Sequence, residues 1–150
     1  MKKLTQRKEL IKRLRSDPLA VLELYNGPED RDVNESLVRA LEDESRVVRR
    51  AAVESLVALN DLYAASSIYW TLRKGSDHAR LAAAEVLGRL PEPFSIPFLV
   101  DALQDPVAAV RIASVRALGA IHDPRAVDSL KRILDRLDGE VRNAALEVLK

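Results

Sequence analysis

A dipeptide of valine or alanine followed by arginine recurs along this chain at a constant interval of 31 residues. A small residue follows the first residue of each pair after four positions, and a leucine follows after eight. Because these positions share one face of an α-helix, each copy predicts an amphipathic helix. A fixed period of this length indicates one structural unit that is copied in tandem and stacked. The four pairs are Val48-Arg49, Ala79-Arg80, Val110-Arg111 and Val141-Arg142.

A second apolar pattern precedes each copy. Leu37, Ile68, Leu99 and Leu130 are each followed four residues later by another leucine. Each repeat is therefore expected to contain two amphipathic helices, named helix A and helix B in chain order. No stretch alternates with a period of two, so no β-sheet is expected. The predicted repeats are residues 30–60, 61–91, 92–122 and 123–150, after a degenerate N-terminal capping unit at 1–29.

Aspartate-proline pairs mark several predicted helix starts. Asp105-Pro106 places an N-cap acceptor before a proline at the first helical position, which predicts the start of a B helix. Asp123-Pro124 predicts the start of the next A helix in the same way, and Asp17-Pro18 is similar. We expect Gly75 and Gly139 in the short turns between helices A and B.

Residues 105–127, DPVAAVRIASVRALGAIHDPRAV, are close to the consensus of a known repeat. They resemble the HEAT-repeat family, in particular the short HEAT-like repeats of the phycobilisome-lyase type and the artificial proteins built from them. The resemblance runs from about Asp30 to the last residue. It implies an all-α, right-handed α-solenoid of about five stacked helical hairpins, formed as a single domain over residues 1–150. Such folds carry many different functions.

Composition narrows the setting. The chain has no cysteine, which leaves neither a disulfide framework nor a thiolate site. No apolar run approaches the roughly 20 residues that span a bilayer, and basic residues interrupt any signal-peptide block in residues 1–15. A cytoplasmic protein is therefore expected. The net charge of +1 favours no class of partner.

The equally spaced arginines have two interpretations. They could grip a regular polyanion. In the HEAT-like family, however, the matching arginine joins a ladder with acidic residues in the turn before helix B. The resemblance implies that Asp43 and Asp105 are the acids here, with Asp77 or Asp138 as substitutes in the second and fourth repeats. We expect the structural ladder, made of Asp43, Arg49, Arg80, Asp105, Arg111 and Arg142.

Differences among the repeats indicate where a partner binds. In the resembled family, one side of helix B lines a concave face that varies with the ligand. Leu81 and Ile112 are apolar on this side, and both charge signs surround them. This pattern is typical of a protein-binding surface, although the two side chains could instead fold onto adjacent helices. The predicted contact residues are Val47, Arg50, Glu54, His78, Leu81, Glu85, Arg89, Ala109, Ile112, Arg116, Ala120, Glu140, Asn143 and Glu147.

Trp70 is a second candidate contact, together with Tyr69. The equivalent positions hold charged residues in the other repeats. A lone tryptophan at a polar position predicts an interface anchor. The alternative is that Trp70 covers the neighbouring loop, which contains Tyr63.

The two ends of the chain leave alternatives open. Residues 1–15 contain seven basic side chains and one acidic one, Glu9. They predict either a helix that caps the stack or an arm that binds nucleic acid or an anionic membrane. At the other end, Leu146 and Leu149 have no capping helix after them. The alternatives are a piece of a longer array and a homodimer formed through this end.

Catalysis finds little support. The two histidines, His78 and His122, lie in different repeats, and neither has metal-ligand spacing to another ligand. HEAT-like deoxyhypusine hydroxylase holds iron through His-Glu dipeptides, whereas here Ala79 and Asp123 follow the histidines. We therefore predict no catalytic residue, no metal and no cofactor. The expected function is a non-enzymatic scaffold for another protein. The alternative that the resemblance implies is an accessory or chaperone subunit of a lyase-like enzyme that acts on a chromophore or cofactor.

Overall fold

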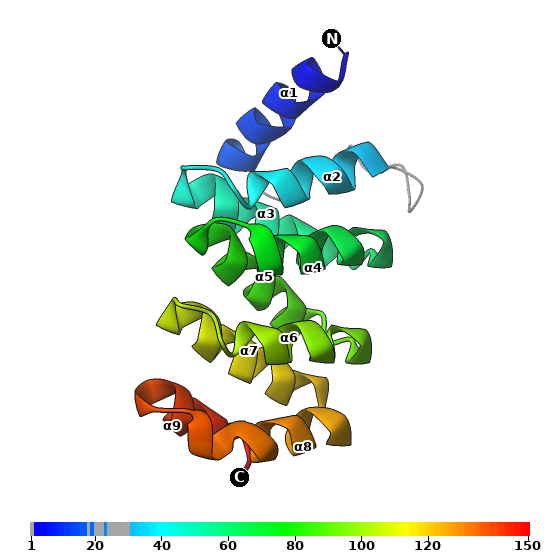
Figure 1. Cartoon of the computed structure of the whole chain (residues 1–150). Coiled ribbons are helices and arrows are strands. Elements are labelled where there is room, and N and C mark those ends of the chain that lie inside the picture. Colours follow the sequence, from blue (N-terminus) through cyan, green and yellow to red (C-terminus); the bar gives the residue numbers. More distant parts are fainter. Residues whose placement is uncertain (1, 18, 20–22, 24–30) are drawn as a thin grey trace. The chain divides into compact units, whose positions relative to one another are not determined.

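The computed structural model describes residues 2–17, 19, 23 and 31–150, and the side chains from residue 7 onward within this part (Figure 1). These residues form helices and turns and contain no strand, which confirms the all-α prediction. The chain divides into two compact units, Met1–Ala83 and Ala84–Lys150. The helices are α1 (Lys2–Ser16), α2 (Arg31–Ala40), α3 (Arg46–Leu59), α4 (Ala65–Lys74), α5 (Asp77–Arg89), α6 (Ile96–Ala102), α7 (Ala108–Ile121), α8 (Pro124–Ile133) and α9 (Gly139–Val148).

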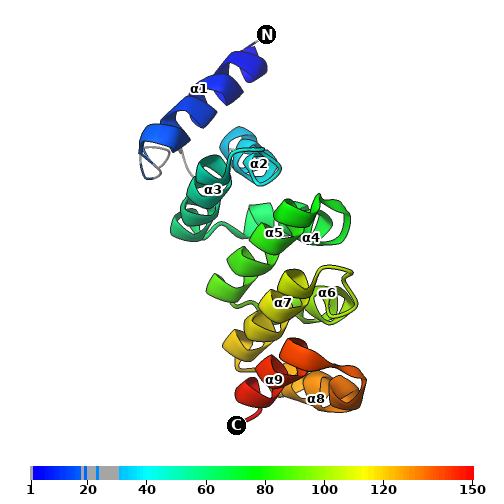
Figure 2. The same cartoon turned by 90° about the vertical axis from the view of Figure 1, so that its left-hand side faces the viewer.

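The N-terminal unit, Met1–Ala83, has two layers. Helix A of the first repeat, α2, packs against helix B, α3, and also against α4 of the next repeat. Helix α1 packs against α3 and α2 (Figure 2). Leu14, Leu37 and Leu41 are fully buried between these helices. The layers form because each helix has an apolar stripe that only a neighbouring helix can remove from water.

The C-terminal unit, Ala84–Lys150, repeats this arrangement. Helices α6 and α8 form one layer, α7 and α9 form the other, and α7 packs across the layers against both α6 and α8. Small residues allow the B helices to approach closely. A Cβ added at Gly119 would lie 2.8 Å from both terminal methyl carbons of Val148, so only glycine fits against α9 there. The buried leucines Leu99, Leu118 and Leu130 fill the space between the layers.

Short 3-10 helices begin or end several A helices. They are η2 (Leu62–Ala64) before α4, η3 (Pro93–Ser95) before α6 and η4 (Leu134–Arg136) after α8. In the N-terminal unit, η2 is tied to α2 by a hydrogen bond. Asn34 Nδ2 donates to Asp61 Oδ2 at 2.7 Å, and the other carboxylate oxygen of Asp61 accepts from the amide of Tyr63. This bond joins the first repeat to the second.

The Asp123-Pro124 prediction is confirmed, and the Asp105-Pro106 prediction is wrong. Asp123 is the N-cap of α8 and accepts from the amide of Arg125. By contrast, α7 begins only at Ala108. The amide of Asp105 donates to the carbonyl of Ala102, the last residue of α6, so Asp105 belongs to the turn that follows the A helix. Its side chain then accepts from the amide of Val107 at 2.9 Å and shapes the turn rather than the helix start.

Two other predicted turn signals have different outcomes. Gly75 follows α4 directly and forms the turn to α5. Gly139 is the first residue of α9 and has a φ of +49°, a conformation that favours glycine. At the N-terminus, Asp17 accepts from the amide of Leu19, while Pro18 lies outside the described residues. The second half of the predicted capping unit at 1–29 also lies mostly outside them.

Candidate functional site

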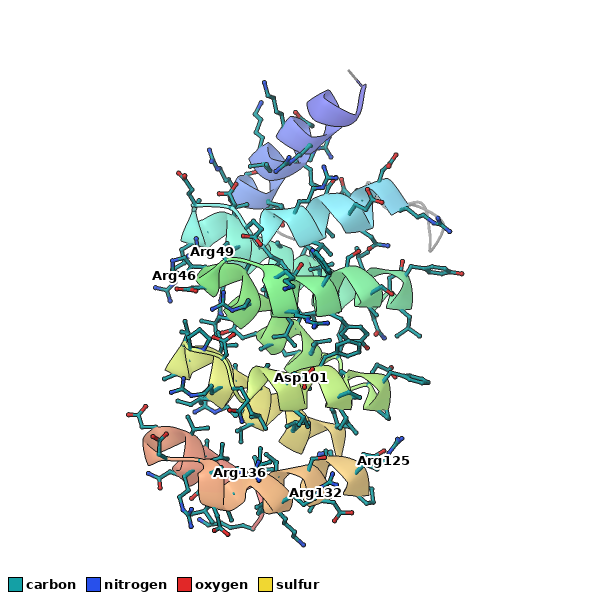
Figure 3. The ribbon with its side chains drawn as sticks, in the orientation of Figure 1. Arg46, Arg49, Asp101, Arg125, Arg132 and Arg136 are labelled. Atoms are coloured by element: carbon teal, nitrogen blue, oxygen red, sulfur yellow. The ribbon has the colours of Figure 1, made fainter. Side chains whose placement is uncertain are left out.

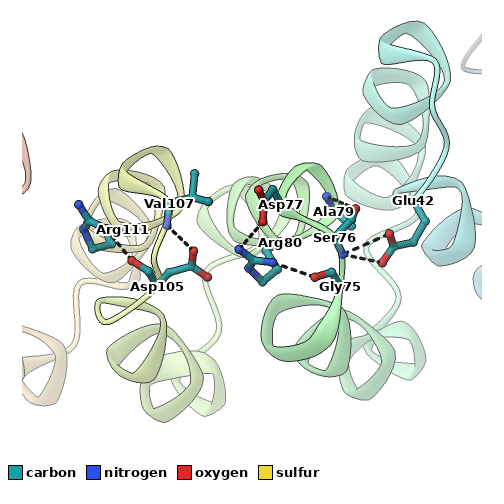
Figure 4. A network of polar contacts seen from close by, with 9 residues as sticks. All are labelled: Glu42, Gly75, Ser76, Asp77, Ala79, Arg80, Asp105, Val107 and Arg111. Carbon is teal, nitrogen blue, oxygen red and sulfur yellow. Dashed lines mark hydrogen bonds and ion pairs between the residues drawn. The ribbon is translucent and has the colours of Figure 1, made fainter.

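The arginines of the 31-residue period bind main-chain carbonyls in the turns between helices A and B. Arg49 Nη1 donates to the carbonyl oxygens of Asp43 and Glu44, both at 2.8 Å. Arg111 Nη1 donates to the carbonyl oxygen of Asp105 at 2.6 Å (Figure 4). These carbonyls lie in the turns after α2 and α6, and the guanidinium satisfies them with charge-assisted hydrogen bonds.

The other two arginines use the same kind of acceptor and add a carboxylate. Arg80 donates to the carbonyl oxygen of Gly75 at 2.9 Å and pairs with Asp77 Oδ1 at 2.8 Å (Figure 4). Arg142 donates to the carbonyl oxygen of Leu134 at 3.0 Å and lies 3.9 Å from Asp135 Oδ1. The arginines are half-buried in their turns, which makes them part of the frame.

The carboxylate ladder that was expected across the repeats stays a prediction. The carboxylates of Asp43 and Asp105 accept main-chain hydrogen bonds in their own turns: Asp43 Oδ1 accepts from the amide of Ser45 at 2.8 Å, and Asp105 Oδ1 accepts from the amide of Val107 at 2.9 Å. These amides lie two residues away, closer along the chain than the arginine. In the fourth repeat the acid beside Arg142 is Asp135, in place of the predicted Asp138.

The predicted contact residues in the N-terminal unit lie on accessible parts of α3 and α5. Val47 is 59% exposed at the first turn of α3. Arg50 and His78 are exposed as well, while Glu54 and Leu81 are half-buried. Figure 3 shows Arg46 and Arg49 at the same end of α3. An exposed valine among polar groups is an apolar feature that a partner could cover.

In the C-terminal unit, the corresponding residues lie on α5, α7 and α9. Ala109 and Arg116 are exposed on α7, and Ile112 between them is half-buried. Arg89, Glu140, Asn143 and Glu147 are exposed, whereas Glu85 and Ala120 are half-buried. Leu81 belongs to the N-terminal unit and Ile112 to the C-terminal unit. Their predicted position side by side stays a prediction.

Trp70 projects into solvent from α4. It is 66% exposed, whereas Tyr69 beside it is half-buried. Tyr63 is itself 64% exposed, so Trp70 does not bury the loop that contains Tyr63. The equivalent residues Asp101 and Arg132 are also exposed in their helices, which explains why this position is polar in other repeats (Figure 3).

Sequence reasoning missed four further exposed apolar residues, of which Leu19 is 56% exposed. Leu62 lies beside Tyr63 in η2, and Phe94 and Phe98 lie in η3 and α6, with Phe94 81% exposed. A signal for them was present, because Tyr63 and Phe94 are 31 residues apart and hold the same place in successive repeats. The third equivalent is Arg125. Aromatic residues at a repeated exposed position are candidates for contact with a partner.

The histidines and acids of the described residues form no metal-binding group of three or more. His78 is exposed in the first turn of α5. His122 is the C-cap of α7 and has a φ of +53°, the left-handed conformation that ends a helix, so it forms part of the turn after α7. The side-chain hydrogen bonds from Arg125 lower the pKa of the Asp123 carboxyl from 3.8 to about 2. Within the same described part, none of the helices is both long and apolar enough to cross a membrane.

The last helix, α9, has part of its apolar surface accessible. Leu146 is 43% exposed and Leu149 is half-buried. Homodimerisation through this end stays a prediction.

Comparison with known families and proteins agrees with this architecture. The family model described as HEAT repeats matches residues 65–150. An uncharacterized phycocyanin operon protein Z from Pseudanabaena tenuis (strain PCC 7409) is 34% identical over 103 residues, which cover 63% of this chain. The same alignment covers 51% of that protein, so the chain spans about half its length.

Two solved structures are also similar. Human deoxyhypusine hydroxylase in complex with glycerol superposes with a TM-score of 0.63 and 32% identity, over 81% of this chain and 44% of that one. The complex of CpcE and CpcF of phycocyanin lyase from Nostoc sp. PCC7120 gives a TM-score of 0.36 and 21% identity, over 95% and 75% of the two chains. This second likeness is distant and carries no argument about function.

Proposed function

This chain belongs to the HEAT-repeat family, and we propose that it is a non-enzymatic scaffold that binds another protein through its B helices. On each B helix, the partner would contact the side that lines the concave face in this family. Recognition would rely on a largely preformed surface, which limits the conformational entropy lost on binding.

One regularity carries the proposal. In every B helix, three positions on one side are exposed or half-buried. Counted from the first residue of the repeated valine/alanine-arginine pair, they are the residue before it, the second residue after it and the sixth residue after it. The same side of each B helix therefore remains accessible to a partner. A solenoid uses such a repeated side as an extended binding surface.

The chemistry of this side favours a protein partner. Val47, Leu81 and Ile112 supply apolar contact area, and residues of both charge signs surround them. Arg50, Glu85 and Arg116 would orient the partner at the rim. Nucleic acid needs an excess of positive charge that releases counterions, and this side is roughly balanced.

Photo-crosslinking tests which side contacts the partner. A photoreactive phenylalanine analogue replaces Val47 or Ala109, both exposed on B helices, in the full chain. The matched controls carry the same analogue at Ser66 or Asp128, which are exposed on the A helices α4 and α8. We expect the same protein to be crosslinked from both B-helix positions, as identified by mass spectrometry. Crosslinking from Ser66 and Asp128 in place of the B-helix positions would contradict the proposal.

Charge substitutions on the same side of the B helices test whether this side is needed to capture the partner. Val47→Glu introduces a carboxylate at an exposed position, so the fold should persist while partner capture is lost. Leu81→Glu combined with Ile112→Glu should also abolish capture and leave helicity intact by circular dichroism, although both residues are half-buried. Capture that is unchanged in both variants would rule out this face.

A second candidate function rests on the 34% identity with the phycocyanin operon protein. In this alternative the chain is an accessory or chaperone subunit of a lyase-like enzyme that handles a chromophore. Expression together with a source of phycocyanin chromophore tests it. Absorbance of the purified chain beyond the aromatic band would support this function, and a colourless chain would leave the scaffold as the proposal.

A further inference from the structure

The described part of α1 carries an unusual excess of positive charge. Residues 7–16 contain five basic side chains and one carboxylate. Arg13 Nε lies 3.3 Å from Glu9 Oε1, so the single acid is occupied by one of the bases. Within this unit, residues 31–83 are neutral, with eight basic and eight acidic side chains, whereas residues 17–30 contain four acidic side chains and no basic one. The excess of positive charge is therefore confined to α1.

Three of these basic residues form one stripe along α1. Lys8, Lys12 and Arg15 are all exposed, and their spacing of four and three residues places them on the same side of the helix. With a rise of 1.5 Å per residue, the stripe from Lys8 to Arg15 is about 10 Å long. A nucleic-acid strand carries one phosphate per about 3.4 Å, so a stripe of this length faces about three phosphates.

The opposite side of α1 is used by the fold. Leu10 and Leu14 are buried where α1 packs against α2 and α3 (Figure 2). An amphipathic helix that binds a membrane needs its apolar side free to enter the acyl boundary. Here that side faces the protein core, and the side left to solvent is charged. This arrangement favours a polyanion that is bound from outside over a lipid surface.

We propose that the outer side of α1 binds the phosphate backbone of duplex nucleic acid without regard to sequence, through Lys8, Lys12 and Arg15. Residues 7–16 contain no aromatic side chain. Base stacking, on which single-strand binding usually depends, therefore has no platform on this part of α1. A rigid stripe of cations suits the regular backbone of a duplex. This surface is separate from the B-helix side proposed for the protein partner.

Fluorescence anisotropy with a labelled duplex of about 20 base pairs tests the inference across a range of salt concentrations. Three phosphate contacts predict a slope of about −2.7 for the logarithm of the binding constant against the logarithm of salt concentration, or about 40-fold weaker binding at 200 mM than at 50 mM. The triple variant Lys8→Gln, Lys12→Gln and Arg15→Gln should lose this binding. It removes the charges at exposed positions and leaves Leu10 and Leu14 in place.

The control has the same net charge change in the C-terminal unit. Lys131→Gln, Arg132→Gln and Arg136→Gln neutralise three exposed cations on α8 and η4, two of which Figure 3 labels. The control should bind the duplex as the wild type does. Equal loss in both triple variants, or no loss in either, would overturn the proposal. Binding to phosphatidylserine vesicles without binding to the duplex would also overturn it and assign α1 to a membrane.

Discussion

Arg111 Nη1 lies 2.6 Å from the main-chain carbonyl oxygen of Asp105, six residues earlier in the chain. The hydrogen bond closes the turn between α6 and α7. The corresponding arginine of each other repeat also donates to a main-chain carbonyl, in the turn between helices A and B of its own repeat. The most regular residue of the sequence therefore stabilises the frame of each repeat through the backbone, whatever side chains that turn carries.

Removing this hydrogen bond should destabilise the fold. We expect Arg111→Ala to lower the free energy of unfolding by about 1.5–3 kcal/mol, the range for hydrogen bonds to charged groups. Arg116→Ala on the same helix is the control, because Arg116 is exposed, and it should change stability by less than about 0.5 kcal/mol. Urea denaturation measures both. Equal effects would show that Arg111 contributes little through the turn.

Gly75 is required for a close approach. A Cβ at this position would lie 2.6 Å from the carbonyl oxygen of Thr71 and 2.8 Å from Glu42 Oε1, which is held near the amide of Ser76. Gly75→Ala should therefore cost about 1–3 kcal/mol of stability. Gly88→Ala is the comparison. Gly88 lies within α5, and a Cβ at this position would meet Ala117 of α7 at an ordinary distance of 3.4 Å. That change should be neutral or stabilising in thermal unfolding, because alanine favours the helix.

Leu118 tests the core between helix layers. It is 1% exposed, and Leu118→Ala should cost about 2–5 kcal/mol through lost burial and the cavity that remains. Leu146→Ala removes the same atoms from a residue that is 43% exposed and should cost much less. The difference is measured by chemical denaturation. A similar cost at both positions would mean that α9 loses its exposed surface in solution.

The Asp123–Arg125 pair predicts a small dependence of stability on pH. Hydrogen bonds from the Arg125 side chain hold the pKa of Asp123 at about 2, below its ordinary 3.8. A carboxyl whose folded pKa is lowered stabilises the fold above its unfolded pKa, and this contribution is lost as the pH falls from about 4 to about 2. Asp123→Asn keeps an oxygen acceptor for the amide of Arg125 but removes the charge.

The measurement for this pair is the difference in melting temperature between the wild type and Asp123→Asn. It should favour the wild type at about pH 6 and shrink towards zero at about pH 2. A difference that is constant over this range would show that the charge of Asp123 has no stabilising role. The pair is on the surface, so added salt should also reduce the effect.

Two aspartate-proline pairs illustrate how far the sequence could predict local structure. Both Asp105-Pro106 and Asp123-Pro124 have the composition of a helix start, yet only the second begins a helix at its proline. Asp105 of the first pair lies in the turn after α6, where its amide donates to the carbonyl of Ala102, the last residue of that helix. The dipeptide alone therefore does not specify whether a helix begins at its proline.

The exposed aromatic residues illustrate the converse. Trp70 was evident as an anomaly because its equivalents are charged. Phe98 was not, because an apolar residue near the start of an A helix resembles a core position, and Phe94 was indicated only by its spacing of 31 residues from Tyr63. The path of η3 and α6 leaves both side chains exposed.

The sequence by itself determined the 31-residue period, the paired helices and membership of the HEAT-repeat family. These follow from the side of each helix that is apolar, a property that the spacing of residues along one helix already contains. The tertiary structure decided which acceptor each arginine takes and which apolar side chains remain accessible. It also decided that the apolar side of α1 is covered. Those outcomes depend on the path of each turn and on the neighbouring helix, which spacing along the chain does not specify.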